Sequence, residues 1–326
     1  MMNRTGWIAA ALGLAVLTGP AMGADAFPTR PVTLVVPFPA GGPVDTTTRI
    51  VADKMKDVLG QPVVVENVGG AAGGLAAARV AKAAPDGYIF MTGIWGTHVA
   101  NGAIYKLTYD VKDDFTPIAL VSVNPLLIVS SKKVPANNLK ELVDWLKANP
   151  GKATQGTSGV GSVGHLGGVF FEKMTGTKYN FIPYRGLAPA MQDLAAGNID
   201  LMFDTPATSL PHVTAGTIRA YAVTAKTRLA SAPDIPTVDE AGMPGLHVST
   251  WTAFFGPKGM DKAVVAKLEA AAQKALADPE VQKRLASVGQ DVYPADQRSA
   301  AYLAKFQDEE IKKWWPLIKD ANIKVE

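Results

Sequence analysis

Short apolar strand patterns alternate with amphipathic helix patterns along this 326-residue chain, and the first pair shows the arrangement most clearly. The β-branched run Val32–Val36 ends in a Pro/Ala/Gly loop at residues 37–42, and a helix pattern over residues 44–59 follows at once. A strand that leads through such a loop into a helix places free backbone N–H groups and the positive end of the helix dipole at one edge of a sheet. The loop therefore predicts an anion site, with a tight turn that binds nothing as the alternative.

A second glycine-rich loop of the same kind occupies residues 156–165, again between a strand pattern and a helix pattern. Thr157, Ser158 and Ser162 add hydroxyl donors to its backbone amides. A carboxylate accepts three or four such hydrogen bonds without any basic side chain. Two such loops facing each other would form a carboxylate clamp. The alternatives are that Ser162 only caps its helix and that His165 faces the core rather than the ligand.

Further candidate ligand contacts follow other strand patterns, because ligands of open α/β sheets collect at the carboxyl ends of the strands. Asp45 opens the first helix, where a carboxylate complements the helix dipole or caps the backbone. Arg185 could pair with a distal carboxylate of the ligand or lie solvated on the surface. Asp204 could bind a ligand amine or cap the next helix. The candidates of this group are Gly41, Gly42, Asp45, Thr97, Tyr184, Arg185 and Asp204.

The length of the chain predicts two domains, since 326 residues exceed what one core usually holds. The alternation of strands and helices from residue 31 onward is typical of an α/β protein with largely parallel sheets. No linker rich in Gly, Ser or Pro separates two halves, so we expect strands to cross between the domains near residues 119–124 and 237–250. The expected lobes are residues 27–121 with 247–326, and residues 122–246.

The first 26 residues have the pattern of a secretory signal peptide. Arg4 supplies positive charge, residues 6–17 form an apolar stretch too short to span a bilayer comfortably, and small residues follow. We expect cleavage near Gly23 or Ala26 and a periplasmic protein, with a retained membrane anchor as the alternative. The chain has no cysteine, which excludes disulfides, thiolate catalysis and cysteine-bound metals.

Several kinds of chemistry lack the motif that they require. The four histidines have no metal-binding spacing, residues 67–74 lack the G-x-G-x-x-G pattern, and no phosphate-binding G-x-x-x-x-G-K-[ST] motif occurs. We therefore expect no cofactor. The net charge of +3 is scattered among acidic residues, which argues against nucleic-acid binding. A serine-dependent hydrolase that uses Ser158 or Ser162 with His165 remains an alternative, although G-x-S-x-G fails at Val160.

Short motifs occur in order along the mature chain, and together they resemble a known family. The ordered set resembles the Bug-type extracytoplasmic solute receptors, which are the substrate-binding components of tripartite tricarboxylate transporters. Each motif is short, but the combination is specific and covers essentially the whole mature chain. The motifs are residues 27–45, 64–70, 85–88, 157–165, 183–186 and 195–200.

The resemblance implies a type II periplasmic binding protein fold, in which two α/β lobes close on a small carboxylate around a hinge of crossing strands. It places carboxylate contacts in the two glycine loops, with weaker support for His165 and Asp204. The segment 95–98 stands where relatives often have small polar residues, so ligand identity does not carry over. The implied contacts are Phe38, Ala40, Gly41 and Gly42 in the first loop and Thr157, Ser158, Gly159 and Ser162 in the second.

The sequence and the resemblance together predict a monomeric solute receptor rather than an enzyme. Its expected partners are a small carboxylate and the transmembrane subunits of a transporter. A dicarboxylate, a tricarboxylate, an aromatic acid or an acidic amino acid would each satisfy the loops. A ligand sensor that presents its closed form to a signalling partner is one alternative, and the serine-dependent hydrolase is the alternative from a different functional class.

Overall fold

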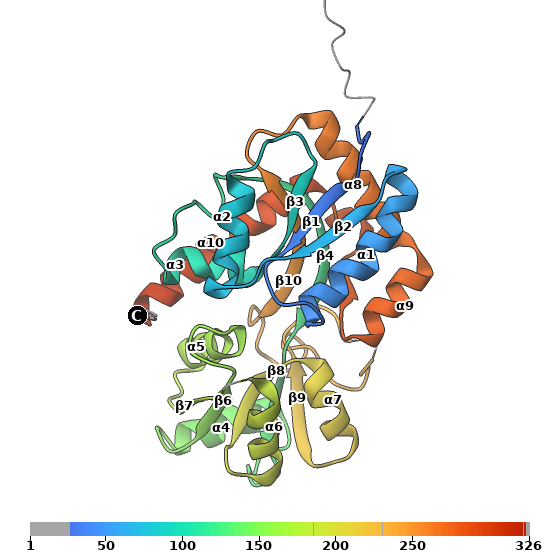
Figure 1. Cartoon of the computed structure of the whole chain (residues 1–326). Coiled ribbons are helices and arrows are strands. Elements are labelled where there is room, and N and C mark those ends of the chain that lie inside the picture. Colours follow the sequence, from blue (N-terminus) through green and yellow to red (C-terminus); the bar gives the residue numbers. More distant parts are fainter. Residues whose placement is uncertain (1–26, 185, 230, 322, 324–326) are drawn as a thin grey trace, which may run out of the picture.

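The computed structural model describes residues 27–184, 186–229, 231–321 and 323. The expected signal peptide and Arg185 lie outside the described residues. Two lobes are stacked one above the other, each built on its own β-sheet (Figure 1). The mixed α/β architecture with two lobes confirms the fold class predicted from the sequence.

The sheet of the first lobe has the strand order β11-β4-β10-β3-β1-β2. Strand β1 pairs in parallel with β2 and β3, whereas β10 is antiparallel to both of its neighbours, β3 and β4. Strand β4 therefore runs in the same direction as β3. The strands of this sheet are β1 (Val32–Val36), β2 (Val63–Asn67), β3 (Ile89–Ile94), β4 (Phe115–Pro125), β10 (Ser249–Pro257) and β11 (Asp291–Val292).

The sheet of the second lobe has the order β7-β6-β8-β5-β9. Strands β6, β7 and β8 are parallel, and β5 is antiparallel to both β8 and β9. Both sheets are therefore mixed, and the expectation of largely parallel sheets was wrong. The strands are β5 (Leu127–Ser131), β6 (Thr154–Thr157), β7 (Asn180–Pro183), β8 (Leu201–Asp204) and β9 (Ile218–Val223).

The crossing strands explain why the sheets are mixed. Strand β4 leaves the first lobe at the edge where β1 and β3 end, and it continues as β5 into the second lobe. Strand β5 enters that lobe against the direction of β8, and β10 returns to the first lobe against the direction of β3. As a result, the carboxyl ends of the parallel strands in one lobe are directed toward those in the other lobe (Figure 1).

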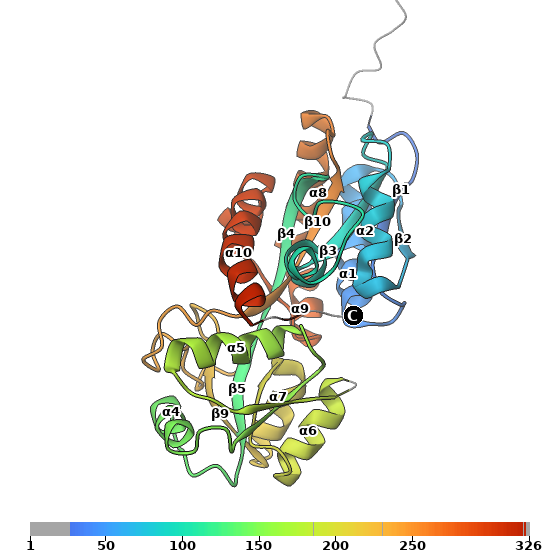
Figure 2. The same ribbon diagram turned by 90° about the vertical axis from the view of Figure 1, so that its left-hand side faces the viewer.

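Helices cover both faces of each sheet (Figures 1 and 2). In the first lobe, α1, α8 and α9 share one apolar cluster, while α2 and α10 share another. In the second lobe, α4 and α5 pack on the opposite face from α6 and α7. The helices are α1 (Pro43–Leu59), α2 (Gly74–Ala81), α3 (Asn101–Ile104), α4 (Leu139–Ala148), α5 (Val163–Thr175), α6 (Leu187–Ala196), α7 (Pro206–Thr214), α8 (Lys262–Ala277), α9 (Pro279–Ser287) and α10 (Ala300–Asp320).

The C-terminal helix α10 joins the cores of the two lobes. Its Trp314 packs edge-on against Trp95 of the first lobe, with ring centroids 5.2 Å apart, and lies 5.8 Å from Phe170 of α5 in the second. Lys313 reaches over the Phe170 ring and donates a hydrogen bond to the carbonyl of His247. Trp314 and its neighbour Trp315, near the end of this helix, therefore pack in the core, as large aromatic residues commonly do.

Thr224 ties together the segments that meet between the lobes. Its hydroxyl accepts a hydrogen bond from the Leu126 N–H at 2.9 Å and lies within hydrogen-bonding distance of the carbonyls of Leu126 and Val248. Leu126 joins β4 to β5, and Val248 leads into β10, so one buried hydroxyl holds both crossing segments. A buried donor that loses its acceptor costs free energy because it cannot regain a bond to water.

Replacing Thr224 by Val should lower the free energy of unfolding by about 1–3 kcal/mol, because the isosteric side chain leaves the Leu126 N–H without its best acceptor. Urea unfolding followed by circular dichroism measures this loss. The exposed Thr214 of α7 provides the control, and Thr214→Val should change the midpoint little. Equal midpoints for the two variants would contradict the stabilising role of the Thr224 hydroxyl.

Candidate functional site

The first glycine loop lies where β1 ends and α1 begins, at the end of the first lobe that is directed toward the second lobe (Figure 1). Gly42 is the N-cap of α1 and supplies no side-chain cap, and Pro43 fills the first helical position. Ala40 and Gly41 are exposed, and Gly41 has a φ of +81°, which favours glycine. The helix therefore begins with uncapped backbone N–H groups beside an open loop.

Asp45 braces this loop from inside. Its carboxylate is 2% exposed and accepts hydrogen bonds from the Gly41 N–H at 2.8 Å, from Arg49 Nε at 2.9 Å and from Asn67 Nδ2 at 2.9 Å. Asn67 also donates to the carbonyl of Phe38, again at 2.9 Å. Burial alone would raise the pKa of Asp45, but the hydrogen bonds from Arg49, Gly41 and Asn67 outweigh it, so the pKa is lowered. Asp45 thus fixes the loop conformation and is not free to face a ligand.

The second glycine loop lies where β6 ends and α5 begins. Ser162 is the N-cap of α5, and its hydroxyl accepts a hydrogen bond from the His165 N–H at 3.3 Å. The Thr157 hydroxyl is buried and lies 3.3 Å from the Gly159 N–H. Ser158 is exposed, and Gly159 is partly exposed, so these two positions of the loop are open to a ligand.

His165 supports the second loop in the way that Asp45 supports the first. Its Nδ1 accepts a hydrogen bond from the Gly161 N–H at 3.1 Å, and its ring packs edge-on against Phe181. Because Nδ1 is the acceptor, the ring proton lies on Nε2. Burial lowers the pKa of His165, so the ring is neutral at pH 7. The imidazole ring of His165 forms no hydrogen bond with the hydroxyl of Ser158 or Ser162. The serine-to-imidazole hydrogen bond that a serine hydrolase needs is therefore not formed here.

Three other predicted contacts are held by their own lobes. Thr97 is buried and bonds through its hydroxyl to the backbone of Ile94 at 3.0 Å. Tyr184 donates from its hydroxyl to Asp193 at 2.6 Å, and burial together with this carboxylate raises its pKa to about 12. Asp204 is fully buried and accepts from Ser209 at 2.5 Å, while burial raises its pKa to about 6. Thr97 and Tyr184 therefore have structural partners, whereas Asp204 has a partner for Oδ2 only, and its buried Oδ1 has no hydrogen-bond partner among the described residues.

The segment 95–98, of which Thr97 is a predicted ligand contact, lies largely inside the first lobe. Trp95 and His98 are buried, and the His98 ring stacks on Phe255 with 3.9 Å between ring centroids. Burial lowers the pKa of His98 to about 3, so the ring stays neutral. His98 lies within a π-helical turn over Gly96–Ala100, and Trp95 is the N-cap of this turn. These two side chains therefore belong to the core of the first lobe, and not to the surface that faces the second.

Asn67 and Arg49 are the supporting residues that sequence reasoning missed as site residues. Asn67 ends β2, the strand next to β1, so its position beside the first loop was accessible to the strand-end argument. Arg49 lies one helical turn after Asp45 and connects Asp45 to Asn67, to which its Nη2 donates at 2.9 Å. Their signal was present in the sequence, but only the pairing of β1 with β2 shows that the three residues meet.

Each loop lies at the end of its lobe that is directed toward the other lobe, and the second loop comes close to α3 of the first lobe. A methyl group added at Gly161 of the second loop would lie 3.1 Å from Ile104, which ends α3 in the first lobe. Figure 2 shows α5 of the second lobe below α10, and α6 below the side of the first lobe that carries β1 and α1. Among the residues that the structure describes, there is no group of three or more His, Cys, Asp or Glu side chains that could hold a metal ion. The same described residues include no helix that is long and apolar enough to cross a membrane.

The model of the tripartite tricarboxylate transporter family receptor matches residues 47–323. The chain belongs to this receptor family. BugT of Bordetella pertussis is 32% identical to the receptor over 93% of this chain and 92% of the relative. The family match and this relative confirm the resemblance found in the sequence.

Solved structures show the same fold. MatC (Rpa3494) from Rhodopseudomonas palustris, solved with bound malate, is 38% identical with a TM-score of 0.72, covering 90% of this chain and all of that one. Rpa4515 of R. palustris, solved with adipate, is 33% identical with a TM-score of 0.74, covering 92% of this chain and all of that one. The receptor therefore shares its two-lobed α/β architecture with proteins whose structures hold dicarboxylates.

Replacing Asp45 by Asn should lower stability above about pH 4, because the neutral amide forms weaker bonds with Arg49 and cannot accept from every donor. The pKa of Asp45 is lowered in the folded state, so its contribution is present above the unfolded-state pKa and is lost as the pH falls through the folded-state value. Thermal unfolding between pH 3 and pH 7 should show a smaller acid dependence for Asp45→Asn. The exposed Asp57 of α1 provides the control, and an unchanged pH profile in Asp45→Asn would contradict the brace.

Proposed function

We propose that the receptor is exported, captures a small carboxylate between its lobes and delivers it to a tripartite tricarboxylate-type membrane transporter. The observation that carries this proposal is the pair of glycine loops, each of which opens a helix at the end of a lobe directed toward the other. Closure of the lobes would direct two helix N-termini at one carboxylate and remove it from water.

The donors in this proposed site are backbone amides and hydroxyls. Each helix dipole contributes up to about 2 kcal/mol in a buried geometry, so hydrogen bonds must supply much of the affinity. The exposed positions Ala40, Gly41 and Ser158 and the partly exposed Phe38 and Gly42 would contact the ligand, together with Gly159. Asp45 and His165 would act as positioning residues, because each holds a backbone N–H of its own loop.

The ligand class comes from chemistry and from the relatives together. Neither loop contains a lysine or an arginine, which suits a carboxylate held by neutral donors rather than a more highly charged phosphate. MatC with malate and Rpa4515 with adipate make a small dicarboxylate the first class to test. A tricarboxylate, an aromatic acid and an acidic amino acid form the rest of the test set.

Export and delivery complete the proposal. Residues 1–26 would be removed as a signal peptide, and the mature receptor would act as a monomer in the periplasm. The proposed lobes are residues 27–121 with 247–326, and residues 122–246, and they would move about the segments that Thr224 ties together. We propose binding without turnover, because His165 Nδ1 is bonded to the Gly161 amide rather than to a serine hydroxyl.

Replacing Gly41 by Leu should abolish the thermal stabilisation that a carboxylate ligand gives, because the side chain would occupy the mouth of the first loop. Gly60→Leu is the matched control, since both glycines have positive φ (+81° and +69°) and open space around the added atom. Gly60 ends the same helix at the opposite terminus, so its variant carries similar strain without touching the loop.

The measurement is differential scanning fluorimetry with malate, adipate, citrate, benzoate and aspartate. A ligand at 100 times its dissociation constant should stabilise the wild type and Gly60→Leu by about 2.7 kcal/mol, and Gly41→Leu by much less. Equal ligand stabilisation of Gly41→Leu and Gly60→Leu would show that the first loop does not contact the ligand. Absence of any stabilisation of the wild type by the whole set would contradict the carboxylate proposal.

A further inference from the structure

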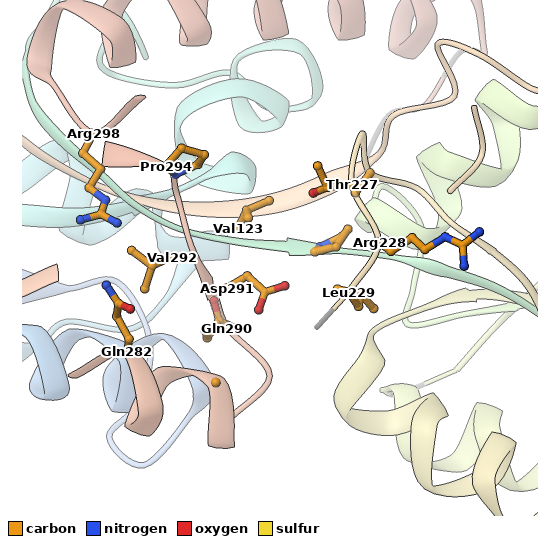
Figure 3. A pocket seen from close by; sticks show the side chains of 13 residues that line it. Val123, Thr227, Arg228, Leu229, Gln282, Gln290, Asp291, Val292, Pro294 and Arg298 are labelled. Carbon is orange, nitrogen blue, oxygen red and sulfur yellow. The ribbon is translucent and has the colours of Figure 1, made fainter. Parts of the chain in front are cut away.

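A cavity of about 410 Å³ lies between the lobes, away from the two glycine loops (Figure 3). One wall comes from the first lobe, namely helix α9 and the segment 290–298 that follows it. The other wall comes from residues 225–229, which follow β9 in the second lobe, and Val123 and Pro125 of β4 connect the two walls. No residue that lines this cavity belongs to the predicted carboxylate site.

Arg298 lines this cavity as an arginine without an ion-pair partner among the described residues. The residue is only 8% exposed, and its Nε donates to the carbonyl of Tyr293 at 2.6 Å. Within the described part of the chain, no acidic side chain forms an ion pair with Arg298, and the only hydrogen bond of its side chain is the one from Nε. Its Nη atoms are not among the buried polar atoms without a partner, so they remain open to an occupant of the cavity. Partial burial lowers the pKa of Arg298, because desolvation disfavours the charged guanidinium.

A carboxylate in the same cavity is also unpaired. Asp291 lies in β11, burial raises its pKa, and no cationic side chain among those described forms an ion pair with it. Figure 3 shows the guanidinium of Arg298 on one side of the cavity and the carboxylate of Asp291 extending toward Leu229 of the second lobe. The cavity therefore presents one cation and one anion that do not neutralise each other.

Two further polar side chains line the cavity: Gln290 offers it a hydrogen-bond donor, whereas Arg228 is already paired with a carboxylate. Gln290 is buried, and its Oε1 accepts from the Ser122 hydroxyl at 2.9 Å, which leaves its NH₂ group as the free end. Arg228 also lines the cavity, but it pairs with Glu240 at 2.9 Å and donates to the carbonyl of Pro233 at 2.7 Å. In Figure 3 its guanidinium points away from the other labelled side chains.

We propose that this cavity binds a small zwitterion that carries a carboxylate and an amine, such as a small amino acid. The carboxylate would bond to the Nη atoms of Arg298 and to the amide of Gln290, and the ammonium would bond to Asp291. Because the two walls belong to different lobes, an occupant would contact both lobes and change the free energy of closure. By linkage, it would also change the affinity of the site between the glycine loops.

The test uses the mature chain with Gly41→Leu, so that the carboxylate site of the first loop is blocked and the result does not depend on the proposed function. Isothermal titration calorimetry with glycine, β-alanine and 5-aminovalerate, which differ in charge spacing, should give saturable binding for one or more of them. Acetate and methylammonium, which each carry only one of the charges, should bind at least about tenfold more weakly.

The variants assign this binding to the cavity. Arg298→Gln and Asp291→Asn should each weaken the best zwitterion by about tenfold or more, because each removes a charge-assisted hydrogen bond. Arg228→Gln is the matched control, since it removes an arginine that lines the same cavity but is already paired, and its affinity should be unchanged. Arg298→Lys, which keeps the charge, provides a second variant if Arg298→Gln does not fold.

The proposal is overturned if none of the zwitterions binds in the Gly41→Leu background. It is equally overturned if acetate binds as tightly as the best zwitterion, or if the variants of Arg298 and Asp291 bind as the wild type does. Loss of binding in Arg228→Gln to the same extent would also overturn it, because the effect would then not be specific to the unpaired groups.

Discussion

The direction in which β4 and β10 cross between the lobes is the constraint on which the rest of the structure depends. Strand β4 runs with β3, leaves the first lobe at the carboxyl edge of its parallel strands and becomes β5 of the second lobe. Strand β5 enters against β8, so the carboxyl edge of the second sheet is turned back toward the first. Two strand-to-helix loops that are more than a hundred residues apart in the sequence are thereby directed at each other.

Each loop is stabilised by one buried side chain of its own helix. Asp45 holds the Gly41 amide and is held by Arg49 and Asn67, and His165 holds the Gly161 amide while it packs on Phe181. A pre-formed loop loses less conformational entropy when a ligand binds, so such supports strengthen binding without touching the ligand. The lobes can thus be rigid at their loops and move about the segments at Thr224.

Local signals in the sequence predicted the elements near the site well. The apolar run of β1 ends at the proline of the loop, so this strand has the predicted bounds, and α1 begins one residue before the helix pattern predicted over residues 44–59. Helix α7 is harder to predict from sequence, because Pro211 lies inside it and argues against a helix, whereas Pro206 stands at the first helical position, where proline is tolerated. The burial of His98 could not be predicted, since its ring stacks on Phe255 of β10, more than 150 residues away. The antiparallel pairings likewise follow from the crossing strands and not from any local pattern.

Closure of the lobes on a carboxylate held by both loops is the central claim, and the absence of cysteine makes a direct measurement possible. Cysteines introduced at the exposed positions Lys56 of α1 and Lys140 of α4 can carry a pair of spin labels, one on each lobe. The distance between the labels should shorten when the best carboxylate saturates the wild type. It should stay unchanged in Gly41→Leu at the same concentration. Tight binding to the wild type with no change in the distance would contradict the account.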